Sequence, residues 1–153
     1  KYTAAQYKEG VEKLRKYFDK PAITTDDIVG FPGETHEEFE ETRKFIEDIG
    51  FFELHVFKYS RRKNTPAAVM KDQVSDDIRE ERSNILLALD KELSDRYRES
   101  FLGCEVEVLF EEVKNGIQTG HTREYITVGT RGKEDLKGKT VRTVIDGSKL
   151  FFV

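Results

Sequence analysis

Two helix-start signals near the beginning of the chain constrain its fold more than any other feature. Thr3 with Gln6, and Thr35 with Glu38, have the spacing of a capping box, in which side chains and backbone amides of the first turn satisfy one another. Apolar side chains follow each signal at helical spacing: Tyr7, Val11, Leu14 and Phe18 after the first, and Phe39, Phe45, Ile46 and Ile49, with Thr42, after the second. The sequence therefore predicts two amphipathic helices, the first of which Pro21 ends.

A short strand is predicted after each of these helices. Residues 22–29 are rich in β-forming side chains and lie between Pro21 and Gly30, and residues 54–59 follow Gly50, a glycine suited to the end of a helix. The order helix, strand, helix, strand predicts a parallel sheet with right-handed crossovers. Two strands do not make a stable sheet alone, so we expect this part to belong to a larger α/β domain.

The second half of the chain has a different pattern. After a polar loop at 60–74, Ser75 caps a long predicted helix that ends near Glu99. Its apolar stripe consists of Ile78, Ile85, Leu86, Leu89, Leu93 and Tyr97. Short alternating runs separated by glycine-containing turns then predict strands at 105–112, 117–120, 125–130, 140–145 and 150–153. Five strands in about fifty residues favour a small closed barrel.

The predicted fold class is thus α/β plus all-β. We expect an α/β part over residues 1–74, a connecting helix over 75–100 and a small five-stranded β-barrel over 101–153. The chain begins with Lys1, and its one methionine is Met70, so we interpret it as a fragment of a longer protein.

Composition excludes several classes of protein. Apolar residues make up 37% of the chain and charged residues another 37%. No run reaches the roughly 18 apolar residues of a membrane span, and no secretory signal opens the chain, so a cytoplasmic location is expected. With one cysteine, Cys104, and histidines that lack metal-ligand spacing, we predict no disulfide framework, no metal site and no catalytic residue. The net charge of −4 means that any nucleic-acid surface must be local.

The turn Gly30-Phe31-Pro32-Gly33 is the first candidate site. It follows a predicted parallel strand, and ligands of α/β folds gather at the carboxyl ends of such strands. Two glycines allow close approach of the backbone to a ligand, and the helix that starts at Thr35 points unpaired amides to the same edge. The turn is neither a P-loop nor a Gly-x-Gly-x-x-Gly fingerprint, and a turn that needs two glycines for its own geometry is the alternative.

A basic cluster after the second strand is the next candidate. Lys58, Arg61, Arg62 and Lys63 form the densest basic segment of the chain, with Tyr59 among them. Such a cluster near a cleft could receive phosphates or a carboxylate. An ordinary solvated loop is the alternative.

The last candidate lies on or beside a strand of the predicted barrel. His121, Arg123 and Tyr125 alternate with Thr122 and Glu124, and small barrels often bind RNA through basic and aromatic side chains of one face. The alternatives are that His121 is only a satisfied surface histidine and that Tyr125 is a residue of the core.

Three segments together resemble a known family: DDIVGFPGETHEEFEET, LHVFKYSRRKNTPAAVMKDQV and GHTREYITV. In this order they resemble the radical S-adenosylmethionine methylthiotransferases, most of all the branch that modifies N6-threonylcarbamoyladenosine next to the tRNA anticodon. The resemblance covers nearly the whole chain. It implies the C-terminal part of a radical SAM partial TIM barrel, a connecting helix, and an OB-like TRAM barrel that binds tRNA.

The resemblance also implies roles for individual residues. S-adenosylmethionine would lie over a [4Fe–4S] cluster, with Gly30, Phe31, Pro32, Gly33 and Glu34 near the adenosine and the segment from Phe57 to Tyr59 against the adenine. Candidate RNA contacts are the basic cluster of Lys58, Arg61, Arg62 and Lys63, and His121, Thr122, Arg123 and Tyr125 of the barrel. The cysteines that hold the clusters are not in this chain, so we expect the fragment alone to bind no cluster and to be inactive.

One stretch departs from the family pattern. Relatives commonly have Ser-Pro-Arg-x-Gly-Thr-Pro, where this chain has Ser60-Arg61-Arg62-Lys63-Asn64-Thr65-Pro66. Asn64 can replace a glycine at positive φ, so we expect the turn to survive, while the contact made by Arg61 or Arg62 stays open. Two other functions stay open as well: a methylthiotransferase of a ribosomal-protein aspartate, and an RNA-binding module without catalysis.

Overall fold

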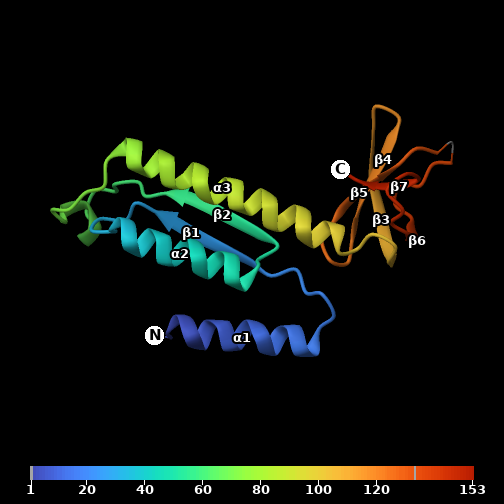
Figure 1. Cartoon of the computed structure of the whole chain (residues 1–153). Coiled ribbons are helices and arrows are strands. Elements are labelled where there is room, and N and C mark those ends of the chain that lie inside the picture. Colours follow the sequence, from blue (N-terminus) through green and yellow to red (C-terminus); the bar gives the residue numbers. More distant parts are fainter. Residues whose placement is uncertain (1, 133) are drawn as a thin grey trace. The chain divides into compact units, whose positions relative to one another are not determined.

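The computed structural model describes residues 2–132 and 134–153, which form two compact units (Figure 1). The first unit ends at Ser94 and the second is Asp95–Val153, so the division falls within a long helix.

The first unit alternates helices and strands. Its elements are α1 (Ala4–Tyr17), β1 (Thr24–Val29), α2 (His36–Ile49), β2 (Glu53–Lys58), the short 3₁₀ helix η1 (Pro66–Val69) and most of α3 (Asp76–Glu99). Both predicted capping boxes are confirmed: the backbone amides of Gln6 and Glu38 each donate to the preceding threonine hydroxyl, Thr3 or Thr35, at 3.2 Å. Gly50 ends α2 in the left-handed conformation, as its position predicts.

The predicted parallel pairing of the two strands is confirmed. β1 and β2 run in register from Thr24 beside Glu53 to Val29 beside Lys58. Alternate residues of each strand turn to opposite faces of the sheet, and one face is covered by the helices. The other face is exposed and carries Asp26, Ile28, His55 and Phe57. This open face reaches the carboxyl ends of both strands, where the first two candidate segments begin.

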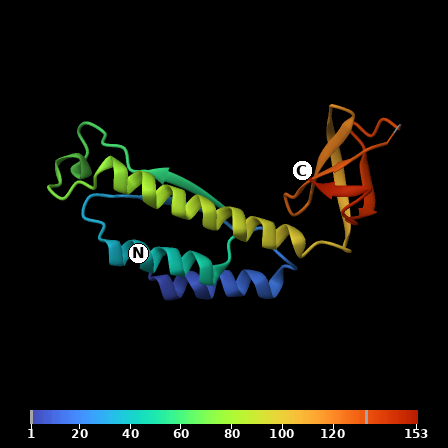
Figure 2. The same ribbon diagram turned by 45° about the horizontal axis from the view of Figure 1, so that its top comes forward.

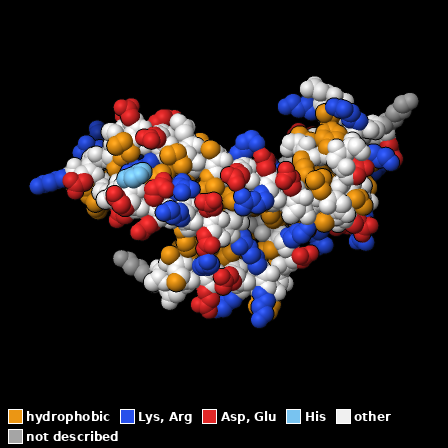
Figure 3. Space-filling model, viewed as in Figure 1, with side chains coloured by type: hydrophobic (Ala, Val, Ile, Leu, Met, Phe, Trp, Pro, Cys, Tyr) orange, Lys and Arg blue, Asp and Glu red, His pale blue; other side chains and the backbone are white. Residues whose placement is uncertain are grey.

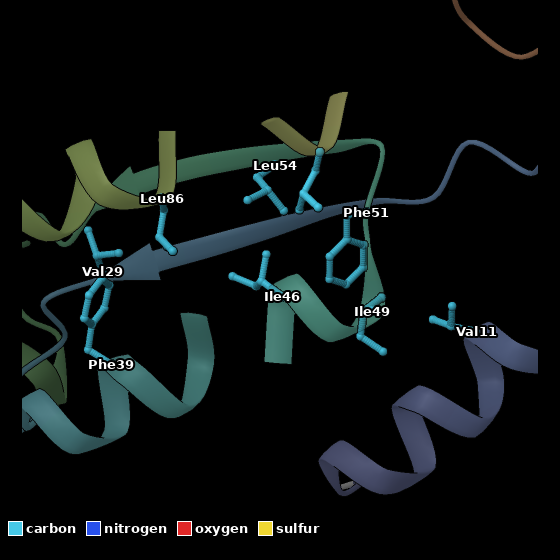
Figure 4. Close-up of a cluster of buried hydrophobic side chains, with 9 residues drawn as sticks. Val11, Val29, Phe39, Ile46, Ile49, Phe51, Leu54 and Leu86 are labelled. Atoms are coloured by element: carbon cyan, nitrogen blue, oxygen red, sulfur yellow. The ribbon is translucent and has the colours of Figure 1, made fainter. Parts of the chain in front are cut away.

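The core of the first unit lies between the sheet and the helices (Figure 4). It contains Val11 of α1, Val29 and Leu54 of the strands, Phe39, Ile46 and Ile49 of α2, Phe51, and Leu86 and Leu93 of α3. α1 lies alongside α2 (Figures 1 and 2), and the centres of the Tyr7 and Phe45 rings are 6.0 Å apart. Leu14 and Phe18, predicted for its inner face, are exposed, whereas Val11 is buried.

The helix α3 is confirmed, but its buried face differs from the predicted apolar stripe. Leu86 and Leu93 are buried, whereas Ile78 and Ile85 are exposed. Polar side chains of α3 lie on this face instead and bond to backbone groups outside the helix. Ser94 Oγ donates to the carbonyl oxygen of Phe52 at 2.5 Å, for example. Arg82 and Ser94 are tolerated in the buried face because both have hydrogen-bond partners.

The second unit is an antiparallel sheet. Five strands occur in its described residues: β3 (Glu105–Lys114), β4 (Ile117–Thr122), β5 (Thr127–Thr130), β6 (Thr140–Val144) and β7 (Leu150–Phe152). Their number and order along the chain are as predicted. The spatial order is β6-β3-β4-β5-β7.

This sheet is curled over its own core, as in a small β-barrel. The inward side chains are Phe101, Val106, Val108, Phe110, Ile126, Val128, Ile145 and Leu150. In the described residues β6 and β7 are the edge strands, so the hydrogen-bonded sheet is a half-barrel and not the fully closed barrel of the prediction. β3 contains a bulge between Phe110 and Glu112, and bulges increase the local twist that curls a sheet.

Candidate functional site

Both glycines of the turn after β1 have a backbone conformation that other residues rarely adopt. Gly30 and Gly33 have φ values of 71° and 90°, in the region that favours glycine. The Gly30 amide donates to Glu34 Oε2 at 2.7 Å, and the Gly33 amide donates to the carbonyl oxygen of Asp72 at 2.7 Å. Pro32 is buried between them, while Phe31 is half-exposed. The turn is therefore held on both sides, and any ligand role comes in addition to this geometric one.

Glu34 forms a buried ion pair that sequence reasoning missed. Its carboxylate accepts a hydrogen bond from Arg82 of α3, and Arg82 Nη1 also donates to the Glu34 carbonyl oxygen at 3.2 Å. The side chains of Glu34 and Arg82 are 16% and 7% exposed, and the Arg82 guanidinium lies 5.3 Å from the Phe39 ring centre. Burial and the nearby charge of Glu34 raise the pKa of Asp27 above its usual value.

Aromatic side chains from both strand ends meet at this edge. The Phe31 and Tyr59 rings contact edge to face with their centres 5.3 Å apart. Beside them is a pocket of about 570 Å³, lined by Ile28, Phe31, Phe57, Lys58, Tyr59, Ser60, Arg62, Thr65 and Ala67. The structure thus brings together predicted residues from two segments. Pro32, Gly33 and Glu34 line a different hollow against α2, which Phe31 shares.

Tyr59 is fixed by its backbone and has an unsatisfied side chain. Its amide donates to the carbonyl oxygen of Val29 at 2.9 Å, and its carbonyl accepts from Arg79 Nη1 at 2.5 Å. Its hydroxyl oxygen is buried and has no hydrogen-bond partner among the described residues. A buried hydroxyl without a partner is costly, so a ligand that accepted its hydrogen bond would be stabilised here.

Two of the four side chains of the basic cluster have partners elsewhere in the first unit. Lys58 pairs with Glu80 of α3, and Arg61 Nε donates to the carbonyl oxygen of Ala68 at 2.7 Å. Arg62 and Lys63 are exposed, and Arg62 lines the pocket. Asn64 has a φ of 66°, which confirms that it takes the place of a glycine in this turn.

Another candidate surface lies on the second unit. The bulge in β3 leaves Glu111 beside His121, and the Glu111 carboxylate contacts His121 Nδ1. The centres of the His121 and Tyr125 rings are 5.9 Å apart. A hollow of about 390 Å³ is lined by Glu107, Leu109, Glu111, His121, Thr122, Arg123, Tyr125 and Thr140. We call these residues the β3–β4 patch. Arg123 is exposed, and Tyr125 is 74% exposed, so the alternative of a core tyrosine is wrong.

Thr122 holds the turn beneath this patch. It is 5% exposed, and its hydroxyl accepts hydrogen bonds from the amides of Glu124 and Ile126 at 3.2 and 3.3 Å. Tyr125 follows with a φ of 65°, so the strand predicted from residue 125 begins only at Thr127. The turn projects the Tyr125 ring into solvent.

The surface of the molecule carries charges of both signs. Figure 3 shows Lys and Arg interspersed with Asp and Glu over the face in view. Among the residues described, no cluster of three or more His, Cys, Asp or Glu side chains could hold a metal ion. Within the same residues, every helix is too short or too polar to span a membrane.

Comparison with known proteins supplies relatives for almost the whole chain, although no protein-family model matches it. The threonylcarbamoyladenosine tRNA methylthiotransferase MtaB of Bacillus subtilis is 41% identical over 95% of this chain and 33% of its own length. The tRNA-2-methylthio-N(6)-dimethylallyladenosine synthases of Aquifex aeolicus and Acetivibrio thermocellus are 39% and 40% identical, over 98% and 97% of this chain and 34% and 32% of theirs. The resemblance to methylthiotransferases is therefore confirmed, and the chain spans about a third of the length of these relatives.

Proposed function

We propose that this chain is part of a tRNA methylthiotransferase that adds a methylthio group to N6-threonylcarbamoyladenosine in tRNA. The main support for the proposal is that nearly all of the chain is similar to tRNA methylthiotransferases. One of these relatives is named for this nucleoside. Since the chain spans about a third of such a protein, the activity needs the remainder, which would include the cysteines that hold iron–sulfur clusters. We propose that the chain alone is inactive.

The carboxyl ends of β1 and β2 are the proposed site of S-adenosylmethionine. With clusters held elsewhere in the enzyme, this cofactor would supply the radical chemistry of methylthio transfer. Its adenine suits the apolar pocket beside Phe31 and Phe57, and the buried hydroxyl of Tyr59 could donate to one of its polar atoms. The turn from Gly30 to Glu34 would lie along the adenosine, with its backbone held by the contacts described above.

The second unit is the proposed tRNA-binding part, a TRAM barrel over residues 101–153. Tyr125 presents an exposed ring to a base, and Arg123 an exposed cation to a phosphate. His121 lies against the same ring, while Thr122 acts by holding the turn. Lys58, Arg61, Arg62 and Lys63 are the proposed phosphate contacts of the α/β part, residues 1–74, which the helix over 75–100 follows.

Binding of this chain to an unmodified anticodon stem-loop tests the RNA part of the proposal. A DNA hairpin of equal charge is the competitor, at low and moderate salt. We expect preference for the RNA that survives moderate salt. Equal, weak binding that disappears with salt would contradict a tRNA substrate and would favour the ribosomal-protein aspartate instead.

Two variants test the β3–β4 patch in the same assay. Arg123→Ala should weaken binding and lower the salt slope by about one unit, as for the loss of one phosphate contact. Tyr125→Ala should cost about 1–3 kcal/mol with little change in slope, as for the loss of a stacked base. Lys149→Ala, an exposed cation outside the patch, is the matched control. If all three variants bind alike, the patch is not the RNA surface.

A further inference from the structure

Two arginines of α3 reach the ends of both parallel strands. Arg79 Nη1 donates to the carbonyl oxygen of Tyr59, directly after β2. The aliphatic part of the same side chain lies across Gly30, directly after β1: a Cβ built on Gly30 would be 2.2 Å from Arg79 Cγ. Arg79 therefore touches the first residue after each strand, and only a glycine leaves room for it.

Arg82, one helical turn after Arg79, contacts the other end of the Gly30–Glu34 turn. It donates to the carboxylate and the carbonyl oxygen of Glu34, and Glu34 Oε2 accepts from the Gly30 amide at 2.7 Å. The contacts form a continuous chain from Arg82 through Glu34 to Gly30. Phe31, whose ring lines the pocket, lies between the two residues that this chain connects.

A contribution to stability alone explains this arrangement poorly. A buried ion pair is often no more stabilising than apolar residues of the same volume, because desolvation offsets much of the attraction. In some proteins such a pair instead favours one arrangement of its partners over others. Here the partners are the segments that carry Phe31 and Tyr59, which form one wall of the pocket. Holding a binding wall in one geometry lowers the entropy lost when a ligand binds.

We propose that Arg79 and Arg82 are positioning residues that hold the Gly30–Glu34 turn and the Tyr59 segment in the geometry that binds S-adenosylmethionine. This inference rests on the proposed function. Neither arginine lines the pocket beside Phe57, so both act through the residues that they hold.

The test uses the full-length enzyme that contains this chain and measures the Kd of S-adenosylhomocysteine by calorimetry, together with the melting temperature. Arg79→Met and Arg82→Met should weaken binding roughly 10- to 100-fold, because side chains that are no longer held in place must be ordered when the ligand binds. The matched control is Ser94→Ala, which removes a buried hydrogen bond of α3 to Phe52, before β2 begins. This control should lower the melting temperature without changing the Kd.

A double-mutant cycle separates positioning from general destabilisation. If Arg82 acts through Glu34, the effects of Glu34→Gln and Arg82→Met on the Kd should be strongly non-additive, whereas Arg82→Met and Ser94→Ala should act independently. Unchanged Kd values in both arginine variants, with binding by the wild-type enzyme intact, would overturn the positioning role and leave the proposed function standing. A wild-type enzyme that binds no S-adenosylhomocysteine would overturn both.

Discussion

The carbonyl oxygen of Leu109 lies directly beside Gly120: a Cβ built on this glycine would be 2.2 Å from that oxygen. Gly120 pairs with Phe110 in the β3–β4 ladder, immediately before the register shift that passes over Glu111. The same bulge brings Glu111 next to His121. The close approach of the two strands and the β3–β4 patch thus depend on one irregularity of the backbone.

Gly120→Ala should destabilise the second unit by roughly 1–3 kcal/mol, because the new methyl group overlaps backbone atoms of β3. Urea denaturation, with hydrogen exchange of the β3 and β4 amides, measures the effect. The matched control is Gly10→Ala in α1, where a Cβ meets nothing within 4 Å. That change should stabilise the helix by about 0.5–1 kcal/mol. Equal stability of Gly120→Ala and wild type would contradict the register described here.

Asp27→Asn should make the first unit more stable at neutral pH. Burial and the charge of Glu34 raise the pKa of Asp27 in the folded state, so the folded protein holds this proton more tightly than the unfolded chain does. Stability then falls as the pH rises through the raised pKa, and asparagine removes that loss.

Denaturation of the wild type and of Asp27→Asn, across the acid-to-neutral pH range, measures this expected gain in stability. Asp26→Asn makes the same change of charge on the exposed face of β1 and should have little effect. A lower stability of Asp27→Asn than of the wild type at neutral pH would contradict a raised pKa of Asp27 in the folded state.

Asp146→Ala should weaken the turn before β7 in a manner that depends on pH. Hydrogen bonds from the amides of Ser148, Leu150 and Lys149 lower the pKa of Asp146 in the folded state. The stabilisation is present above the usual value near 3.8 and is lost as the pH falls through the lowered pKa. Wild type and variant should therefore differ at neutral pH and converge in acid. Carboxyl chemical shifts from NMR follow the titration directly, and a difference that persists in strong acid would argue against this cause.

Asn64→Gly should fold as well as wild type, whereas Asn64→Val should cost about 1–2 kcal/mol. The reason is the positive φ of Asn64, which asparagine and glycine adopt readily and a β-branched residue does not. Thermal unfolding of the chain compares the two variants. A tolerated valine would mean that the turn does not require this conformation in solution.

Much of the fold could be predicted because its signals are local. The capping residues Thr3 and Thr35 bond to amides three residues ahead, and Gly50 needs no distant partner to end a helix. Strand boundaries were less accurate. β5 begins at Thr127 instead of Tyr125, because the Thr122 hydroxyl captures the amide of Ile126 and forms a turn first.

The candidate site could be predicted only in part. Gly30, Phe31 and Tyr59 stand out in the sequence, and the structure brings them together at one edge of the sheet. Arg79 and Arg82 were missed, although two arginines that interrupt the apolar stripe of a helix are a signal in themselves. Their role could not be read from α3 alone, since Glu34 lies 48 residues away from Arg82.

The sequence by itself determined which helices, strands and tight turns form and their order along the chain, though not every strand boundary, because hydrogen bonds and periodicity within a few residues decide those. Only the tertiary structure decided which side chains of α3 are buried. Ile78 is exposed and Arg82 is buried, against their hydropathy, because a buried charge is tolerated where a distant segment supplies its partner. That partner, Glu34, becomes a neighbour only once the chain has folded.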